Sequence, residues 1–312
     1  MLMISDELTH VDEKAVRVGY IEQARRHALM LLDRFGVETI EHLLVEGFAS
    51  RRGIGLVETQ IDGAKSELIV GPNGATIVLP PGLTDRAERR WLVAHELGHF
   101  ELNHPARPAG KLHLPSPRTR RRDRRHWEDE ADAFASALLM PEPIVEALCS
   151  ARPMTLDVVW QLATQCDVPW IASALRLMRA TWRVCAIVLS HHGEIRWVFP
   201  SLPFLMLFAG HIYPGDPLAA GSLARRFFDT GEPCGPATLV PASSWLEGAS
   251  TELQLQEHSI ACPNNDAVMT MLWHAGESDA RPPQMNVETM SICHDHFLGE
   301  LEANPSLAQI AA

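Results

Sequence analysis

Apolar residues recur every three or four positions over residues 20–48, which predicts two helices separated by Gly36 as a C-terminal cap. The pattern then changes to short runs rich in β-branched residues over 55–59, 66–70 and 75–79, which predict strands. A helical pattern returns in the next stretch of the chain. This order predicts a small β-sheet that lies beside helices.

The next helix is predicted to begin at Asp85, an N-cap residue, and it carries the candidate chemistry. His95 and His99 would stand one turn apart on the same face, so both imidazoles can bind one metal ion. A zinc ion bound by two imidazoles needs a third protein ligand and an open position, and Glu96 could take the proton of a water there. Gly98 costs roughly 1 kcal/mol against Ala in mid-helix, which predicts that another backbone passes close by.

A second predicted helix covers residues 126–140 and ends before Pro141. Glu128 and Asp132 lie one turn apart on it. Glu128 can therefore be the third metal ligand, while Asp132 accepts a hydrogen bond from a ligand imidazole. The alternative is a solvated acidic face, which is what charge runs usually form. The histidine pair upstream favours the ligand interpretation.

Together the two stretches resemble the ImmA/IrrE-type metallopeptidases. That family usually has Asn at the position of Asp132, and Glu130 matches a frequent acidic position, so Glu130 is a second candidate ligand. The family places its ligand three residues before the small residue here occupied by Ala131, which selects Glu128. The matching residues are His95-Glu96-Leu97-Gly98-His99, Leu102 and His104, then Glu128, Ala131, Asp132, Phe134, Ala135 and Leu138-Leu139-Met140-Pro141.

The resemblance implies a zincin-like metallopeptidase domain with one Zn²⁺ per chain. It implies a limited cut in a helix-turn-helix transcriptional repressor, which would release stress-response or mobile-element genes. Glu96 would be the catalytic base, and His104 or His126 could donate a hydrogen bond to the developing oxyanion. The alternative is a non-enzymatic regulator that binds DNA or protein and uses the metal for structure.

A run of arginines lies between the two predicted metal-binding helices, after a Pro-rich segment. We expect an exposed basic loop, which is either simply solvated or docks an acidic substrate face or DNA. A net charge of -12 argues against a chain built mainly to coat nucleic acid. The arginines concerned are Arg118, Arg120, Arg121, Arg122, Arg124 and Arg125.

The remaining chain predicts two further parts. Residues 156–177 resemble a helix-turn-helix unit, but its second helix has few basic residues, so we expect packing or partner docking. After residue 181 come a hairpin over 184–199, a helix over 218–228 and strands over 258–262 and 267–273. This layout resembles a GAF-like domain that senses a small molecule.

The overall prediction is an α+β protein with a metallopeptidase domain over 1–150, a helix-turn-helix-like segment over 151–180 and an α/β domain over 181–312. We expect it in the cytoplasm and not in a membrane, because it shows no secretory signal and no apolar run long enough to span a bilayer. Its cysteines form no Cys-x-x-Cys pair. We expect surface or core residues, not metal ligands, at His191, His192, Cys293, His294 and His296.

Overall fold

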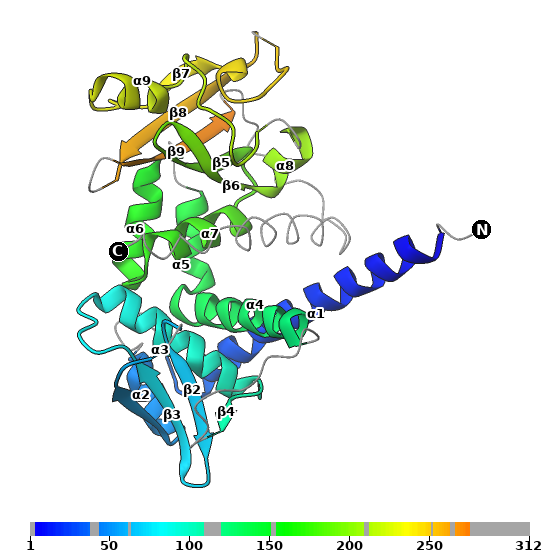
Figure 1. Cartoon of the computed structure of the whole chain (residues 1–312), viewed down its shortest axis with the longest axis vertical. Coiled ribbons are helices and arrows are strands. Elements are labelled where there is room, and N and C mark those ends of the chain that lie inside the picture. The colour runs from blue at the N-terminus through cyan, green and yellow to red at the C-terminus, as the bar shows by residue number, and fades with distance from the viewer. Residues whose placement is uncertain are drawn as a thin grey trace. The chain divides into compact units, whose positions relative to one another are not determined.

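The chain folds as an α+β protein with two compact units (Figure 1). The computed structural model describes residues 4–37, 44–61, 64–108, 120–150, 154–208, 212–250, 252–262 and 266–274. The first unit comprises residues 1–142 with 162–169, and the second comprises 143–161 with 170–312. The domain boundaries predicted near residues 150 and 180 stay predictions.

A small mixed sheet lies in the first unit, with strand order β1-β3-β2-β4. β1 (Ile54–Glu58) pairs in parallel with β3 (Gly74–Leu79), which forms an antiparallel hairpin with β2 (Glu67–Gly71). These strands confirm the prediction. The short β4 (Arg107–Pro108) pairs in parallel with β2 and was not predicted, since a two-residue strand has no pattern of its own.

The long helices of the first unit include α3 (Arg86–Glu101), which packs on β2 and β3 and also on α4 (Arg120–Leu139). The Asp85 side chain accepts a hydrogen bond from the Glu88 backbone N–H at 3.1 Å, which confirms the predicted N-cap. α1 (Ile4–Arg34) packs along α4, and a short α2 (Val45–Arg51) follows. α3 thus lies in contact with both the sheet and α4.

The prediction of a loop for the run of arginines was wrong, because residues 120–125 form the first turns of α4. No Gly or Pro interrupts residues 118–140, and Arg is a good helix former, so the helix of Glu128 extends back through the arginines. α1 likewise begins at Ile4, well before the apolar repeat that predicted a helix from residue 20. In both cases the helix continues into a polar sequence that has no apolar stripe to mark it.

Gly98 confirms the predicted close approach of another backbone. A Cβ atom at this position would lie 3.2 Å from both the Cα and the carbonyl oxygen of Ala131, and 3.1 Å from Cδ1 of Phe134. Both of these residues belong to α4. The missing side chain therefore lets α3 and α4 touch at the level of His99 and Glu128.

The two helices predicted over residues 156–177 are confirmed as α6 (Leu156–Cys166) and α7 (Trp170–Ala180), and α5 (Glu142–Cys149) precedes them. The turn between α6 and α7 is bound to α3. The buried Arg90 side chain donates to the Asp167 carbonyl oxygen at 3.2 Å, and Arg86 forms an ion pair with the Asp167 carboxylate at 2.7 Å. This supports the expected packing role for the turn.

The second unit has a five-stranded antiparallel sheet in the order β6-β5-β9-β8-β7. Its first strand, β5, is buried at six successive positions, because helices cover both faces of the sheet. The predicted hairpin and the two later strands are confirmed. The strands are β5 (Cys185–His191), β6 (Glu194–Pro200), β7 (Thr238–Pro241), β8 (Gln254–Ala261) and β9 (Ala267–His274).

The helix predicted over residues 218–228 is displaced, because α9 (Leu223–Thr230) begins five residues later. Ser222 caps it by accepting a hydrogen bond from the Arg225 N–H at 3.1 Å, and this cap sets its start. α8 (Leu202–Phe208) follows β6, and a short 3-10 turn, η2 (Ala242–Ser244), follows β7. In the described part of the chain, no helix combines the length and apolarity that a bilayer span needs.

Candidate metal centre

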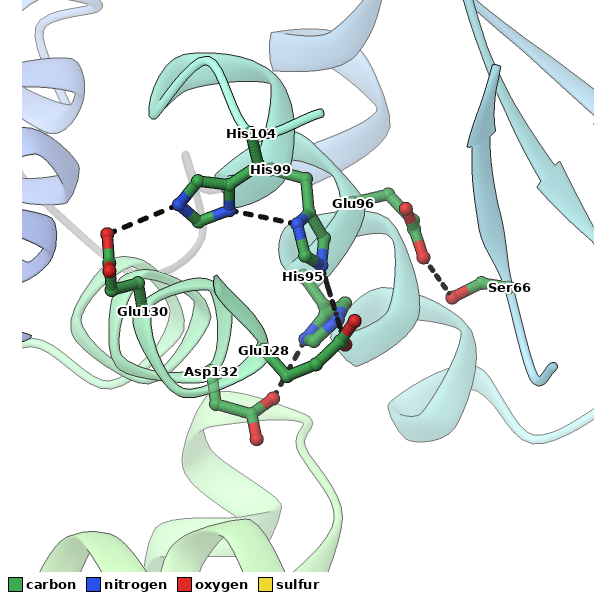
Figure 2. A network of polar contacts seen from close by, with 8 residues as sticks. All are labelled: Ser66, His95, Glu96, His99, His104, Glu128, Glu130 and Asp132. Carbon is green, nitrogen blue, oxygen red and sulfur yellow. Dashed lines mark hydrogen bonds and ion pairs between the residues drawn. The ribbon is translucent and has the colours of Figure 1, made fainter. Parts of the chain in front are cut away.

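Three ligand atoms from α3 and α4 meet at one point (Figure 2). Nε2 of His95 lies 3.1 Å from Nε2 of His99 and 3.2 Å from Oε2 of Glu128, and Nε2 of His99 lies 3.5 Å from the same carboxylate oxygen. Zinc bonds of about 2.0–2.2 Å at tetrahedral angles would separate neighbouring ligand atoms by roughly 3.3 Å. The three residues therefore fit a tetrahedral zinc ion with one position left for water or substrate.

The second nitrogen of His95 meets the side chain of Asp132. Its Nδ1 lies 2.8 Å from Oδ1 of Asp132, which stands one turn after Glu128 on α4 (Figure 2). A carboxylate here keeps the proton on Nδ1 and leaves Nε2 as the metal-binding nitrogen. Asp in place of the family's usual Asn still provides an acceptor.

His104 and Glu130 lie together on the other side of His99. Nδ1 of His104 is 2.9 Å from Nδ1 of His99, and its Nε2 is 3.2 Å from Oε2 of Glu130. Both His104 nitrogens are therefore engaged, which leaves no ring N–H directed at an oxyanion. Glu130, the second candidate ligand, faces His104 and lies outside the group of three ligand atoms. The donor role suggested for His126 stays a prediction.

Glu96 extends from α3 toward the sheet, and its carboxylate is buried (Figure 2). Oε1 of Glu96 accepts a hydrogen bond of 2.6 Å from the hydroxyl of Ser66, the residue directly before β2. No sequence pattern singles out Ser66, because its hydrogen bond to Glu96 depends on how the sheet packs against α3. A buried carboxylate beside the two histidines is suited to accept and return a proton.

The charges of the site act strongly on its ligands. Burial lowers the pKa of His95, but hydrogen bonds and charge interactions with Asp132 and Glu128 outweigh burial and raise that pKa well above its usual value. Burial raises the pKa of Glu128, and hydrogen bonds from His95 and His99 reverse this and hold the pKa well below its usual range. The cluster thus attracts positive charge, whether it is carried by protons or by a metal cation.

The remaining residues singled out from the sequence are the arginines that could dock a partner, and the histidines and Cys293 that are predicted not to bind metal. The side chains of residues 120–125 and the residues Cys293, His294 and His296 lie outside what the structure describes, so docking by the arginines stays a prediction. His191 and His192 lie at the β5–β6 turn with ring centroids 4.0 Å apart. In the described chain, the only group of three metal-ligand residues is His95, His99 and Glu128.

One comparison with known proteins, a family model, covers the residues of this site. Residues 49–178 match the family model of the IrrE N-terminal-like domain, a peptidase family, and this part of the chain belongs to that family. The chain is also similar to a solved structure described as a Mycobacterium tuberculosis transcriptional regulator, with 15% identity and a TM-score of 0.48 over 89% of this chain and 98% of that chain. No curated protein matches the chain.

Proposed function

We propose that this chain, whose residues 49–178 form an IrrE N-terminal-like peptidase domain, is a zinc-dependent endopeptidase with a zincin-like active site. The observation that carries the proposal is the meeting of His95, His99 and Glu128 at tetrahedral spacing, with the buried Glu96 next to them on α3. A purely structural metal site would have no use for a general base at this position.

The residues have distinct tasks in peptide hydrolysis. His95, His99 and Glu128 would hold the ion, which when bound acidifies a water and polarises a carbonyl. Glu96 would take the proton of the attacking water and pass it to the leaving amine. Ser66 holds Oε1 of Glu96, so that Oε2 is the oxygen expected to carry the proton.

Metal analysis with matched variants tests this proposal. Wild type should retain about one zinc per chain, and His99→Ala and Glu128→Ala should lose it. Glu96→Gln should retain the zinc but lose cleavage, because the amide cannot take a proton. A wild type that binds no metal even when zinc is supplied would overturn the proposal, and a Glu96→Gln variant that cleaves normally would refute the role of Glu96.

The substrate we propose is a helix-turn-helix transcriptional repressor, cut once to release stress-response or mobile-element genes. The resemblance to the ImmA/IrrE-type peptidases supports this class. The repressors encoded near the gene should be incubated with wild type and with Glu96→Gln, and a single new fragment should appear only with wild type. Intact repressors under all inducing conditions would count against this substrate.

We also propose that the second unit is a GAF-like sensor that controls cleavage. Its support is a separate five-stranded sheet with its own buried core. The competing function is a non-enzymatic regulator that binds DNA or protein. Steeply salt-dependent DNA binding that Glu96→Gln leaves unchanged, without cleavage of any repressor, would favour that alternative.

A further inference from the structure

A line of hydrogen bonds runs from Glu130 through His104 to the metal ligand His99 (Figure 2). The side chain of His104 is only 5% exposed and that of Glu130 only 14%, whereas the ligand Glu128 is 49% exposed. The His104 ring also stacks on Trp127 with centroids 6.1 Å apart. The line is therefore better buried than the ligand carboxylate, and its three members have fixed neighbours.

The end of α3 builds this arrangement. Asn103 has a positive φ of 56°, its N–H bonds the carbonyl of Phe100, and the N–H of His104 bonds the carbonyl of His99 at 2.9 Å. These bonds define a Schellman C-cap, in which the residue after the left-handed position commonly packs on the residue five before it. Here that packing contact joins His104 to His99 through two ring nitrogens.

Metal binding would decide which atom is the donor in each hydrogen bond of this line. His99 can bind a cation through Nε2 only if the lone pair is there, so its proton must be on Nδ1. That N–H must then donate to Nδ1 of His104, which places the His104 proton on Nε2, facing Glu130. Once Nδ1 of His99 is the donor, neutral His104 must carry its proton on Nε2, and each of the two bonds then has one donor and one acceptor.

We infer that His104 and Glu130 are positioning residues that fix the tautomer and the ring orientation of His99 for metal binding. The inference rests on the proposed metal site and assigns these residues a task within it. Asp132 does the same for His95 directly, and it is 50% exposed. The two imidazole ligands would thus be held in different ways, one by a carboxylate and one by a buried histidine backed by a carboxylate.

Zinc affinity measured by competition with a chelating dye tests the inference on the full chain. His104→Phe keeps a ring beside Trp127 but has no acceptor, so zinc should bind about 10–100-fold more weakly. His104→Asn offers an oxygen near the former Nδ1 and should recover much of this loss. Glu130→Gln should weaken binding less than His104→Phe, because its amide oxygen can still accept from Nε2.

Glu101→Gln is the matched control. Glu101 is also 14% exposed and also pairs with a basic side chain, Arg52, but it bonds no metal ligand. It should leave zinc affinity unchanged. If His104→Phe fails to fold, as judged by circular dichroism, Glu130→Gln against Glu101→Gln decides the question.

Nitrogen NMR of the zinc-loaded protein gives a second readout, which is the protonation of each ring nitrogen. A pair with only a structural role would not require one particular pattern. Nδ1 of His99 and Nε2 of His104 should carry protons, and Nδ1 of His104 should not. A proton on Nδ1 of His104, or equal zinc affinity in wild type and all His104 and Glu130 variants, would overturn the inference alone. A wild type without zinc affinity would overturn the proposed function as well.

Discussion

Gly98 sets the distance between the two helices that supply the ligands. Ala has a better helix propensity by about 1 kcal/mol, yet the new Cβ would meet the backbone of Ala131, which cannot move aside cheaply. We expect Gly98→Ala to lower the free energy of unfolding by about 1–3 kcal/mol and to weaken zinc binding, because α3 and α4 must separate. Urea unfolding and zinc titration measure the two effects.

Gly47 on α2 is the control for this substitution. A Cβ there would meet only Cβ of Leu44, at 3.4 Å, which is ordinary contact. Gly47→Ala should therefore leave zinc binding unchanged and stabilise the chain by roughly 0.5–1 kcal/mol. A Gly98→Ala variant as stable as Gly47→Ala would show that α3 and α4 are not in tight contact.

At the residue scale, the sequence predicted what depends on local spacing. His95 and His99 share a helix face four residues apart, and Glu128 and Asp132 repeat that spacing, so these pairs are visible in one dimension. Ser66 was missed because nothing in a single Ser at the start of a strand indicates which helix will face it. The bond of Glu130 to His104 likewise depends on how α4 packs, and spacing alone left Glu130 as a candidate ligand.

At the element scale, the C-cap of α3 should control the metal site without supplying a ligand. Asn103 has a φ of 56°, which Gly adopts freely and a β-branched residue does not. Asn103→Gly should keep stability and zinc affinity. Asn103→Val should cost about 1–2 kcal/mol and weaken zinc binding, because straightening the cap moves His104 away from His99. Melting curves and chelator competition on the two variants check this.

Equal zinc affinity in both Asn103 variants would contradict the link between the cap and the ligand. The prediction is specific because Asn103 itself is exposed. Only its backbone angle, and not a lost contact of its side chain, would then account for a difference between Gly and Val.

The elements themselves were predicted to different degrees. Most strands and the helices α3, α6 and α7 follow from periodicity and caps, whereas β4, β7 and the helical start of α4 do not. An arginine-rich stretch has no apolar face, and the Pro-rich segment before it suggested a loop. Helix propensity and the absence of Gly and Pro within the stretch made it helical instead. Pairings such as the parallel contact of β1 with β3 cannot be read from either strand alone.

At the scale of the whole molecule, zinc should stabilise the first unit by linkage, since its ligands come from two helices that would separate on unfolding. At a free zinc concentration of about 100 times the dissociation constant, the gain is about 2.7 kcal/mol. Calorimetry with added zinc and with a chelator should show this shift in wild type. His99→Ala should show none, and a shift that persists in this variant would place the zinc elsewhere.

The second unit contains a fully buried carboxylate, Glu257 on β8, inside its core. It accepts hydrogen bonds from Nε1 of Trp245 at 2.8 Å, from the Ala224 N–H at 3.0 Å and from the Ser259 hydroxyl at 2.9 Å. Burial raises the pKa of Glu257, and these hydrogen bonds only partly offset it. One carboxyl group on β8 is thus hydrogen-bonded to both α9 and the segment after β7.

The raised pKa of Glu257 gives the stability of this unit a defined pH dependence. The folded state holds the proton more tightly than the unfolded chain does, so the stabilisation is complete below the ordinary pKa of Glu and is lost as pH rises through the raised value.

Glu257→Gln cannot titrate and should flatten the slope of the free energy of unfolding against pH. It should also cost about 1–3 kcal/mol, because its amide NH₂ cannot accept one of the buried hydrogen bonds. Chemical unfolding of wild type, Glu257→Gln and the exposed control Glu252→Gln across acidic to neutral pH measures both effects. A slope that survives in Glu257→Gln would assign the titration to another group, while its loss in that variant alone would place the proton in the core of the second unit.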